Sequence, residues 1–573
     1  MINLKLSSIL TTIAEISKFK HNEVENVINL SKAARTVRDY DYDIRDAYNE
    51  GLLKKLPGID EFAYKIISEY FERGSIKLFD QLREKYPEDL IKIVRLSGIG
   101  TKKVFEIYEK FNIRTLEDLK DLFSLNYDIK KLAQTNDIES IFLERVAHSA
   151  RYLESLKGRC PRWLVLKYAE KIVEGLSHIN EILSLKIVGS LRRRKAEVGD
   201  IDILVLPEFN IERVDIERSK ELISKIRELF FIKNLVSDNF RKENISVKFS
   251  TIFDIDTEII ITSKKMWPND LLITTGSKNH ILKLRSLAEE KGCINDQIFD
   301  FSQINFKRFK CYKNNDALYE DDDFICPEEK QIYEFLGIDY IVPELREGFN
   351  EVELAKENYL PNLIKISDIR GDLHIHSKYS DGIMDMQAVL KKMKKYDYEY
   401  ISFSDHSESN KYGNGLDKKR LCEKEQYLNE LNKKHNKFSF LMGSEIEIDK
   451  DGNLDYDDSI ISKFDIALGS MHRGFKFDSS FNNARFERAM QNKYIDIIAH
   501  PTGAVFGSRA PYFLDVDRLI DAALRYNKAV EINSYFLRLD LNEENTRKAK
   551  KSDILIAINT DSHRINNIDM MKL

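Results

Sequence analysis

The sequence predicts a multidomain protein with an all-α N-terminal region, a mixed α+β middle region and a C-terminal α/β barrel. Apolar residues recur at helical spacing through residues 4–56. At 200–205, two aspartates stand two residues apart in an apolar, strand-like run, and more strand-like sequence follows. From residue 372 onward, seven short apolar runs are mostly separated by helical stretches, which is typical of a parallel barrel.

Length and composition limit the possible classes of protein. The chain has 573 residues, whereas a single core rarely exceeds about 250–300 residues, so several domains are expected. Its 90 Lys and Arg nearly balance 95 Asp and Glu, so any surface that binds nucleic acid must be local. Five cysteines are scattered without C-x-x-C spacing, which favours a reducing compartment. The sequence shows no signal-peptide pattern and no apolar run of about 18 residues, so we expect a cytoplasmic protein without a membrane span.

The helical region contains two glycine-bearing turns, Leu56-Pro-Gly-Ile-Asp60 and Leu96-Ser-Gly-Ile-Gly-Thr-Lys-Lys103. A turn of this kind at a helix N-terminus directs backbone N–H groups at a phosphate, as in a helix-hairpin-helix that holds DNA without reading its sequence. An ordinary connection between helices is the alternative for each turn. The predicted DNA contacts are Gly58, Gly98, Gly100, Lys102 and Lys103. Asp60 places an acid near the first expected phosphate, so weaker binding is expected there.

The stretch 189–205 combines a possible phosphate cradle with paired carboxylates. It begins with Gly-Ser and four cations, 192–195, which offer backbone N–H groups, a hydroxyl and guanidinium donors to a phosphate. Asp200 and Asp202 share one strand face, where a hard cation such as Mg²⁺ would offset their repulsion. A β-turn followed by two solvated aspartates is the alternative. The combination favours nucleotidyl transfer.

A third carboxylate is expected from the stretch 249–261, which alternates and is predicted to be one strand. That strand would carry Asp254, Asp256 and Glu258 on one face. We favour Asp256 as the third metal ligand, and Asp254 remains an alternative. Thr275-Gly-Ser277 follows, and its simplest interpretation is a helix N-cap.

The seven C-terminal runs mostly end in residues that bind metals. They are 372–376, 400–406, 438–447, 465–472, 495–500, 529–533 and 554–563. Six of the 11 histidines stand at these ends, and functional groups gather at the carboxyl ends of parallel strands in barrel enzymes. Imidazole together with carboxylate suits Zn²⁺, Mn²⁺ or Fe²⁺ better than Mg²⁺ or Ca²⁺. The candidate ligands are His374, His376, Asp381, His406, Glu445, His472, His500, Asp561 and His563.

On these motifs and their order, the chain resembles the bacterial and archaeal family X DNA polymerases with a C-terminal polymerase-and-histidinol-phosphatase (PHP) domain. The resemblance implies an α+β nucleotidyltransferase palm with a thumb, and a distorted (βα)7 PHP barrel with a three-metal site. The expected domains are an end-binding helical domain at 1–88, a second helix-hairpin-helix domain at 89–157, the palm at 158–262, the thumb at 263–340, a linker at 341–370 and the PHP domain at 371–573.

The resemblance also implies residue roles. Asp200, Asp202 and Asp256 would be catalytic and would hold Mg²⁺ or Mn²⁺ in the palm, while the nine C-terminal ligands would hold up to three Zn²⁺, Mn²⁺ or Fe²⁺ ions. The residues expected to bind the nucleotide are Gly189, Ser190, Arg193, Gly199, Thr275, Gly276, Ser277 and Arg285. The family's lyase lysine falls on Ile66, with Lys65 beside it, so lyase activity is not expected.

The implied function is short-gap filling in base excision repair, with 3′–5′ exonuclease activity in the PHP domain; an AP endonuclease activity is left open. The expected partners are gapped or primer-template DNA and dNTP, and a monomer is expected. Ile273-Thr274 and Ile281 replace family residues that contact the nucleotide, so sugar discrimination is not assured. The chain also stops soon after Asp561 and His563, where relatives continue, so reduced PHP activity is an expectation. Two alternatives are a nuclease with a weakened polymerase site and a non-enzymatic DNA-binding scaffold.

Overall fold

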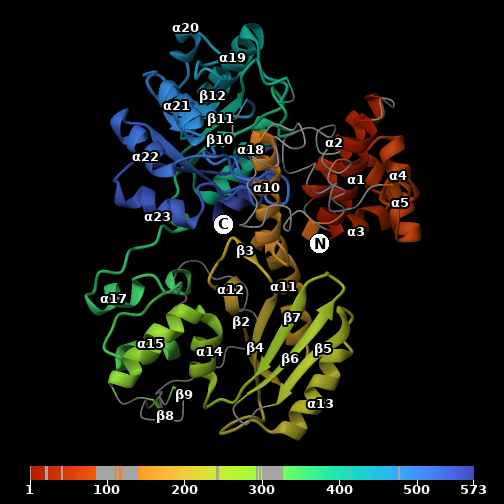
Figure 1. Ribbon diagram of the computed structural model, residues 1–573, viewed down its shortest axis with the longest axis vertical. Coiled ribbons are helices and arrows are strands. Elements are labelled where there is room, and N and C mark those ends of the chain that lie inside the picture. The colour runs from red at the N-terminus through yellow and green to blue at the C-terminus, as the bar shows by residue number, and fades with distance from the viewer. Residues whose placement is uncertain are drawn as a thin grey trace. The chain divides into compact units, whose positions relative to one another are not determined.

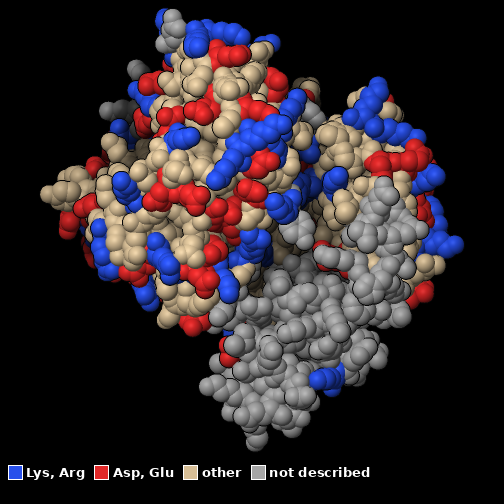
Figure 2. All heavy atoms as spheres, turned by 90° about the horizontal axis from the view of Figure 1, so that it is seen from above, with Lys and Arg blue, Asp and Glu red and all other residues tan. Residues whose placement is uncertain are grey.

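The computed structural model in Figure 1 describes residues 2–19, 24–40, 43–85, 110, 115, 117–118, 140–240, 244–291, 294–295, 298–299, 327–411, 413–435, 437–474 and 478–573. Contacts divide the chain into two compact units. One is essentially Gly158–Asp368, and the other joins Ile2–Lys157 to Ile369–Lys572. None of the described helices is long and apolar enough to cross a membrane. Lys and Arg are interspersed with Asp and Glu on the face seen in Figure 2.

The N-terminal region is helical, as predicted. Its elements are α1 Ile2–Phe19, α2 Val24–Arg38, α3 Ile44–Asn49, the 3₁₀ helix Leu53–Lys55, α4 Glu61–Arg73, α5 Lys77–Lys85 and α10 Ser140–Ser155. The spaced apolar residues form a buried core, in which Leu10 and Ile13 of α1 join Leu30 and Val37 of α2. The second predicted turn, with Gly98, Gly100, Lys102 and Lys103, lies outside the described residues.

The first turn connects the 3₁₀ helix to α4. Gly58 has φ +83°, a left-handed conformation that favours glycine, and a Cβ there would lie 3.2 Å from Thr36 Oγ1. Asp60 caps α4 because its carboxylate accepts a hydrogen bond from the Ala63 backbone N–H. The acid therefore occupies the helix N-terminus. Further along α4, Ile66 is buried in the core and Lys65 is exposed.

A five-stranded sheet with the order β2-β4-β7-β6-β5 forms the middle region. The strands are β2 Ile182–Ile187, β4 Ile201–Pro207, β5 Ile232–Phe240, β6 Ile245–Thr251 and β7 Asp256–Ile261. Apolar residues of β4 and β7 pack in one core with α11 Arg162–Ser177 and α13 Ile216–Arg227. Two short strands, β1 Cys160–Pro161 and β3 Glu197–Val198, pair antiparallel in a separate two-stranded sheet.

The prediction of one strand over 249–261 is wrong. The chain turns between β6 and β7, which pair antiparallel, and Thr251 Oγ1 donates to the Ile255 carbonyl 2.7 Å away across the turn. Asp254 lies in this turn with φ +54° and pairs with Lys233 Nζ at 2.9 Å. Asp256 is the first residue of β7, so only Asp256 and Glu258 share the expected strand. Periodicity alone cannot separate one strand from a tight hairpin without Gly or Pro in the turn.

The same unit also contains helices, one between strands of the sheet and the others after it. They are α12 Gly189–Arg192 before β4, then α14 Trp267–Thr275, α15 Lys278–Glu290, α16 Pro327–Phe335, the 3₁₀ helix Pro343–Leu345, α17 Glu351–Lys356 and the 3₁₀ helix Ile366–Asp368. Two short strands, β8 Ile294–Asn295 and β9 Ile298–Phe299, pair antiparallel. Leu272, Leu284 and Tyr333 belong to the core that joins α14, α15 and α16.

The C-terminal region is a seven-stranded parallel sheet in strict chain order, β10 to β16. The strands are β10 Gly371–Ile375, β11 Tyr400–His406, β12 Ser439–Glu447, β13 Ile466–Ser470, β14 Ile497–Ile498, β15 Ala529–Asn533 and β16 Ile556–Asn559. A parallel bridge from Ile375 to Ser562 brings the first and last strands together, so the barrel is nearly closed. The predicted parallel barrel is confirmed.

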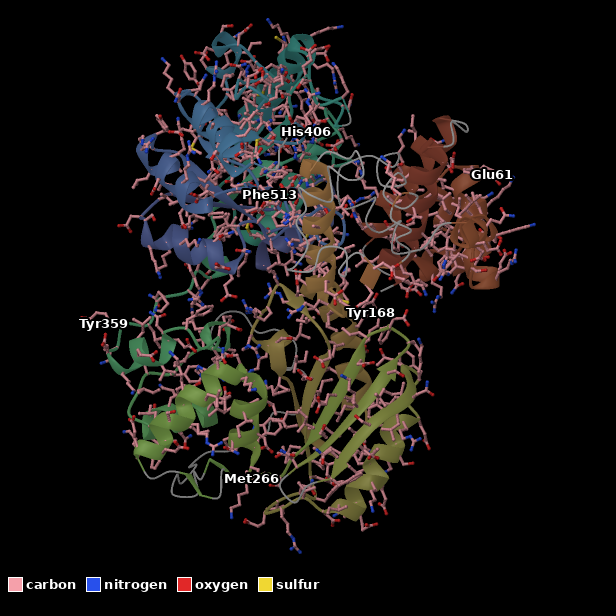
Figure 3. All side chains as sticks on the ribbon, in the orientation of Figure 1. Glu61, Tyr168, Met266, Tyr359, His406 and Phe513 are labelled. Carbon is pink, nitrogen blue, oxygen red and sulfur yellow. The ribbon has the colours of Figure 1, made fainter. Side chains whose placement is uncertain are left out.

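Helices connect the strands of the barrel, and the last one follows the final strand. They are α18 Met386–Met393, the 3₁₀ helix Lys394–Tyr396, α19 Lys418–Lys434, α20 Asp458–Ile461, α21 Ser479–Met490, α22 Val516–Arg525, α23 Glu543–Lys551 and the 3₁₀ helix Ile565–Lys572. His406, labelled in Figure 3, lies at the carboxyl end of β11. In a parallel barrel the carboxyl ends of all strands lie at the same end, so residues such as His406 come together there.

Candidate functional site

Three carboxylates of the five-stranded sheet lie on one face. Asp200 directly precedes β4, Asp202 lies within it, and Asp256 begins β7, which is the parallel neighbour of β4. Lys248 of β6 lies between two of them, because its Nζ is 3.4 Å from Asp200 Oδ2 and 3.6 Å from Asp256 Oδ2. Glu258 is in register with Asp202 on one side and with Lys248 on the other. The face thus concentrates four carboxylates around one lysine.

This crowding shifts the acidity of Asp202. Burial, followed by the charges of Asp200 and Glu258, raises its pKa to about 7. A cation bound beside this carboxyl group would favour its ionised form at neutral pH. A divalent metal ion bound by Asp200, Asp202 and Asp256 would be such a cation.

The Gly-Ser turn of the sequence is the short helix α12, and its first residue touches the carboxylates. Gly189 has φ +64°, and a Cβ there would overlap Asp202 Oδ2. Only glycine allows the backbone to approach the acid so closely. Ser190 is half-buried in the same turn, and Gly199 lies in the bend that leads into β4.

The four cations after this turn are paired with carboxylates from the segment 329–347. Arg193 donates through Nε to Glu347 Oε1 at 2.8 Å and through Nη1 to the Thr275 carbonyl at 2.7 Å. The other pairs are Arg192 with Glu329, Arg194 with Glu344 and Lys195 with Glu347. The fully buried Glu329 also accepts from Arg346. Burial would raise the pKa of Glu329, but the two guanidinium groups hold it well below its usual range.

The predicted sugar-contacting turn lies between α14 and α15. Thr275 is buried and its hydroxyl accepts from Arg192 Nη1 at 2.6 Å, while Ser277 caps α15 by accepting from the His280 backbone N–H. Gly276 packs so closely against Ile281 that a Cβ would lie 2.6 Å from Ile281 Cδ1. Arg285 pairs with Glu289 along α15 at 3.2 Å. The structure therefore brings Thr275 into contact with Arg192 and Arg193.

All nine predicted metal ligands of the barrel converge at the carboxyl ends of its strands. Glu445 is central, with Oε1 lying 2.8 Å from His500 Nε2 and 3.2 Å from His472 Nε2, and Oε2 lying 2.8 Å from His406 Nδ1. Asp561 Oδ1 lies 3.2 Å from His376 Nε2 and 3.6 Å from His374 Nε2.

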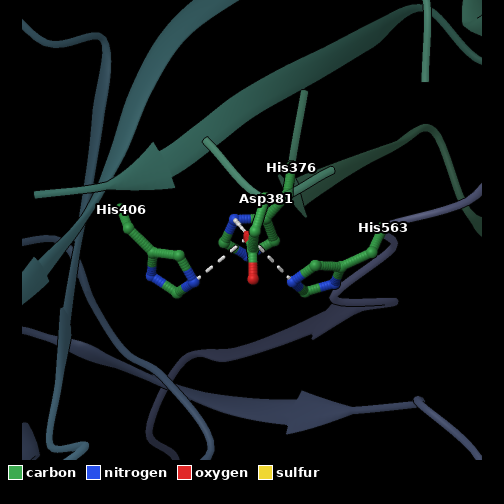
Figure 4. Close-up of side chains that lie close together, drawn as sticks. All are labelled: His376, Asp381, His406 and His563. Carbon is green, nitrogen blue, oxygen red and sulfur yellow. Dashed lines mark ion pairs between the residues drawn. The ribbon is translucent and has the colours of Figure 1, made fainter. Parts of the chain in front are cut away.

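Figure 4 shows a third carboxylate, Asp381, that lies among histidine nitrogens. Asp381 Oδ1 lies 3.5 Å from His406 Nε2, 3.3 Å from His563 Nε2 and 3.9 Å from His376 Nδ1. Three overlapping groups of these side chains each bring their ligand atoms within 4.8 Å of one another.

The donor atoms of this cluster fit metal ions. Within the described part of the chain, several are buried and have no hydrogen-bond partner: His374 Nε2, both ring nitrogens of His376, Asp381 Oδ1, His406 Nδ1 and His500 Nδ1. Such orphaned acceptors cost free energy unless something binds them. Burial lowers the pKa of His376 to about 4, which favours the neutral imidazole that a metal requires.

Two further carboxylates orient the histidines, and sequence reasoning missed both. Glu531 of β15 binds His374 Nδ1 through Oε1 at 2.8 Å and accepts from the His500 backbone N–H at 2.7 Å. Glu447 of β12 lies 2.7 Å from His472 Nδ1. A carboxylate on the second ring nitrogen fixes the tautomer and orientation of a ligating histidine. The available signal was an acid inside an apolar strand run.

Asp405 and Lys424 form a third missed feature. Asp405 precedes His406 and accepts from the Ser377 backbone N–H at 2.8 Å and from the Ser380 hydroxyl at 2.6 Å. Lys424 of α19 lies 2.8 Å from Asp405 Oδ2, and both side chains are fully buried. The pair thus anchors the loop that leads to Asp381.

Comparison with known proteins gives three family matches in one chain. Residues 159–275 match the DNA polymerase beta palm, residues 270–347 the DNA polymerase beta thumb, and residues 372–542 the PHP domain. The chain is 30% identical over 567 residues to the DNA polymerase/3′-5′ exonuclease PolX of Bacillus subtilis, covering 98% of this chain and 93% of that protein.

Two other relatives each match part of the chain. DNA polymerase lambda of Arabidopsis thaliana is 26% identical over 321 residues, 51% of this chain and 53% of that protein. A probable phosphatase of Thermoanaerobacter sp. is 34% identical over 133 residues, 22% of this chain and 52% of that protein.

A palm with three carboxylates followed by a barrel with a metal-ligand cluster defines a two-site enzyme of nucleotidyl transfer and phosphoester hydrolysis. The chain belongs to the family X DNA polymerases that carry a C-terminal PHP domain. Membership confirms the resemblance expected from the sequence and excludes the non-enzymatic scaffold. Both catalytic domains of this family depend on metal ions, and the polymerase domains imply DNA and nucleotide substrates.

Proposed function

We propose that the chain fills short gaps in DNA during base excision repair and trims 3′ ends with its PHP domain. The observation that supports the polymerase most directly is the shared face of Asp200, Asp202 and Asp256 beside Gly189. The PolX relative, named for both polymerase and 3′–5′ exonuclease activity, covers nearly the whole chain. The expected substrates are gapped or primer-template DNA and dNTP.

In the palm, Asp200, Asp202 and Asp256 would hold Mg²⁺ or Mn²⁺ and position the primer 3′-hydroxyl. When bound, the metal ions would lower the pKa of that hydroxyl and offset charge on the triphosphate. The Gly189 and Ser190 backbone would approach the phosphates, with Gly199 shaping the turn. Arg193 would hold the triphosphate in exchange for Glu347. Thr275, Gly276 and Ser277 would line the sugar, and the half-buried Arg285 of α15 would also bind the nucleotide.

Primer extension on a one-nucleotide gap tests the palm assignment. Wild type should insert dNTP with Mg²⁺ or Mn²⁺, and Asp200→Ala should abolish insertion while 3′ degradation continues. Running rNTP beside dNTP tests discrimination, which Ile273, Thr274 and Ile281 leave in question. If wild type degrades a gapped primer and never extends it, the alternative of a nuclease with a weakened polymerase site replaces this proposal.

In the barrel, the nine ligands would hold up to three ions of Zn²⁺, Mn²⁺ or Fe²⁺. When bound, a multi-metal cluster would supply hydroxide near neutral pH and clamp a phosphodiester. Glu531 and Glu447 would keep His374 and His472 oriented. Degradation of a 3′-labelled strand, which His406→Ala should abolish without affecting primer extension, tests this assignment. The same assay on an abasic duplex tests AP endonuclease activity.

The remaining assignments are extensions of the same proposal. Gly58 in the first turn, and Gly98, Gly100, Lys102 and Lys103 in the second, would hold the DNA backbone, with Asp60 weakening the first contact. The domain boundaries are proposed as 1–88, 89–157, 158–262, 263–340, 341–370 and 371–573. A monomer and a cytoplasmic location stay predictions.

A further inference from the structure

Two arginines approach the barrel site from neighbouring loops. Arg509 lies in the loop after β14, and its Nε donates to the Gly503 carbonyl of the same loop. Arg538 lies in the loop after β15, and its Nε lies 3.1 Å from Oδ2 of the predicted metal ligand Asp561. Both guanidinium groups therefore belong to the carboxyl end of the barrel, where the nine ligands meet.

The two loops are tied to each other, which fixes the arginines in place. Asp540, two residues after Arg538, accepts from the backbone N–H groups of Thr502 at 2.9 Å and Gly503 at 2.8 Å. The Phe506 backbone N–H also donates to the Leu537 carbonyl at 2.7 Å. Side chains held on braced loops lose little conformational freedom when they bind a ligand.

Each arginine keeps one buried nitrogen without a hydrogen-bond partner among the residues that the structure describes. These atoms are Arg509 Nη2 and Arg538 Nη1. Metal ions would satisfy the orphaned atoms of the histidines nearby, but a guanidinium group carries only donors and cannot bind a metal. Its buried N–H groups need acceptor oxygens, and leaving them unpaired costs free energy.

The electrostatics of the two loops point to the same kind of ligand. Burial lowers the pKa of Arg509 below its usual value; Tyr512 partly opposes this shift, and the positive charge of Arg538 adds to it. Two positive charges thus stand close together, while the neighbouring carboxylate Asp561 also faces His374 and His376. A buried cation is stable when an anion compensates it.

We propose that Arg509 and Arg538 form a clamp that binds the phosphate group of the substrate beside the PHP metal ligands. The non-bridging oxygens of a phosphodiester accept the forked N–H groups of guanidinium in a bidentate geometry that lysine cannot reproduce. This inference rests on the proposed phosphoesterase function of the barrel. It adds that two residues outside the set of metal ligands bind the substrate, through a phosphate group with at least two free oxygens.

Arg485 shows what a structural arginine looks like in the same barrel. Its guanidinium, carried by α21, donates to the backbone carbonyls of Ile448, Asp449 and Arg473 and so braces two neighbouring loops, while its Nη1 also lacks a partner among the described residues. In the described part of the chain, the guanidinium of Arg509 donates to one carbonyl and lies 5.5 Å from the centre of the Tyr512 ring, and that of Arg538 pairs with the predicted metal ligand Asp561. The clamp arginines therefore retain capacity for an external acceptor.

The test compares Arg509→Gln and Arg538→Lys with the control Arg525→Gln in the metal-loaded full-length chain. Arg525 is an exposed arginine of α22 that pairs with Glu487. The KM for 3′-end degradation and the inhibition constant of inorganic phosphate should each rise about tenfold or more in Arg509→Gln. Metal content, the circular dichroism spectrum and primer extension should match wild type. Arg538→Lys keeps the positive charge but loses the two parallel N–H donors of the guanidinium. It should therefore weaken phosphate inhibition while disturbing the folded structure less than a neutral substitution.

Binding of inorganic phosphate, measured by calorimetry, separates this inference from the proposed nuclease. If wild type binds phosphate through Arg509 but degrades no 3′ end, the clamp stands and the nuclease assignment falls. If wild type degrades DNA, and both variants keep full metal content with unchanged KM and phosphate inhibition, the clamp is wrong. An equal effect in Arg525→Gln also overturns it, because net charge would then explain the result.

Discussion

Lys424 Nζ lies 2.8 Å from Asp405 Oδ2, and neither side chain has any exposed surface. The lysine also donates to the carbonyls of Phe403 at 2.6 Å and Gly443 at 2.9 Å, so all three of its protons are used. Burial would raise the pKa of Asp405, but Lys424 holds it down at about 2. One ion pair thus connects helix α19 to the strand end that carries His406.

We expect Lys424→Met to destabilise the barrel by about 3–5 kcal/mol, because it leaves the buried Asp405 charge without a partner. Urea unfolding followed by the near-UV signal measures the change. Lys419→Met on the same helix is the control, since Lys419 is 85% exposed. Equal stability of the two variants would show that Asp405 is compensated by its serine donors alone.

Glu531→Gln should weaken metal binding in the PHP site about 10- to 100-fold, because the amide no longer fixes His374 through a charged hydrogen bond. Titration with a chelating dye, followed by metal analysis, measures the affinity. Glu543→Gln in α23, whose carboxylate pairs with Arg547 on the surface, serves as the control. An unchanged affinity would mean that His374 is oriented by packing rather than by Glu531.

The palm should bind Mg²⁺ less tightly as the pH falls below about 7. The folded pKa of Asp202 is raised above its usual 3.8 to about 7, so ionising it costs the folded chain free energy, and that cost appears as the pH rises toward 7. Mg²⁺ offsets the cost and displaces one proton below pH 7, so its half-saturating concentration should rise up to about tenfold per pH unit. Primer extension at pH 6, 7 and 8 measures it in a His406→Ala background.

A matched variant identifies the source of this shift. Glu258→Gln removes one of the charges that raise the pKa of Asp202, so the midpoint of the Mg²⁺ dependence should move to lower pH. Glu212→Gln, an exposed residue paired with Lys265, should leave the midpoint where it is. A midpoint unaffected by Glu258→Gln would assign the effect to burial and to the charge of Asp200.

Sequence patterns predicted the barrel and its ligands because most of the ligands end a short apolar run, and a parallel sheet brings all such ends to one edge. Glu531 was not predicted because it lies alone in an apolar strand, without other candidate ligands nearby in the sequence. The histidine that it binds, His374, stands 157 residues earlier. The pairing of Arg193 with Glu347 spans 154 residues and depends on how the helices after the sheet fold back. The hairpin that removed Asp254 from the site has no Gly or Pro to mark it.

Gly189→Ala should abolish primer extension while 3′ degradation continues. A Cβ at this position would overlap Asp202 Oδ2, and φ +64° adds backbone strain of about 1 kcal/mol, so the turn or the carboxylate must move. The control is Gly51→Ala, which has φ +67° but meets no atom within 4 Å. It carries the same backbone cost without the collision. Full extension by Gly189→Ala would place the triphosphate turn elsewhere.

Glu347→Gln should lower the KM for dNTP several-fold. Its carboxylate binds Arg193 at 2.8 Å and Lys195 at 3.5 Å, and Arg193 lies near enough to Asp202 to lower the pKa of that acid. A triphosphate that uses Arg193 must therefore displace Glu347, and the neutral amide is displaced more easily than a carboxylate. Steady-state single-nucleotide insertion measures the KM, with Glu344→Gln as the control because Glu344 pairs only with the more exposed Arg194 among the described cations of this run. A raised KM would mean instead that Glu347 holds Arg193 in its binding conformation.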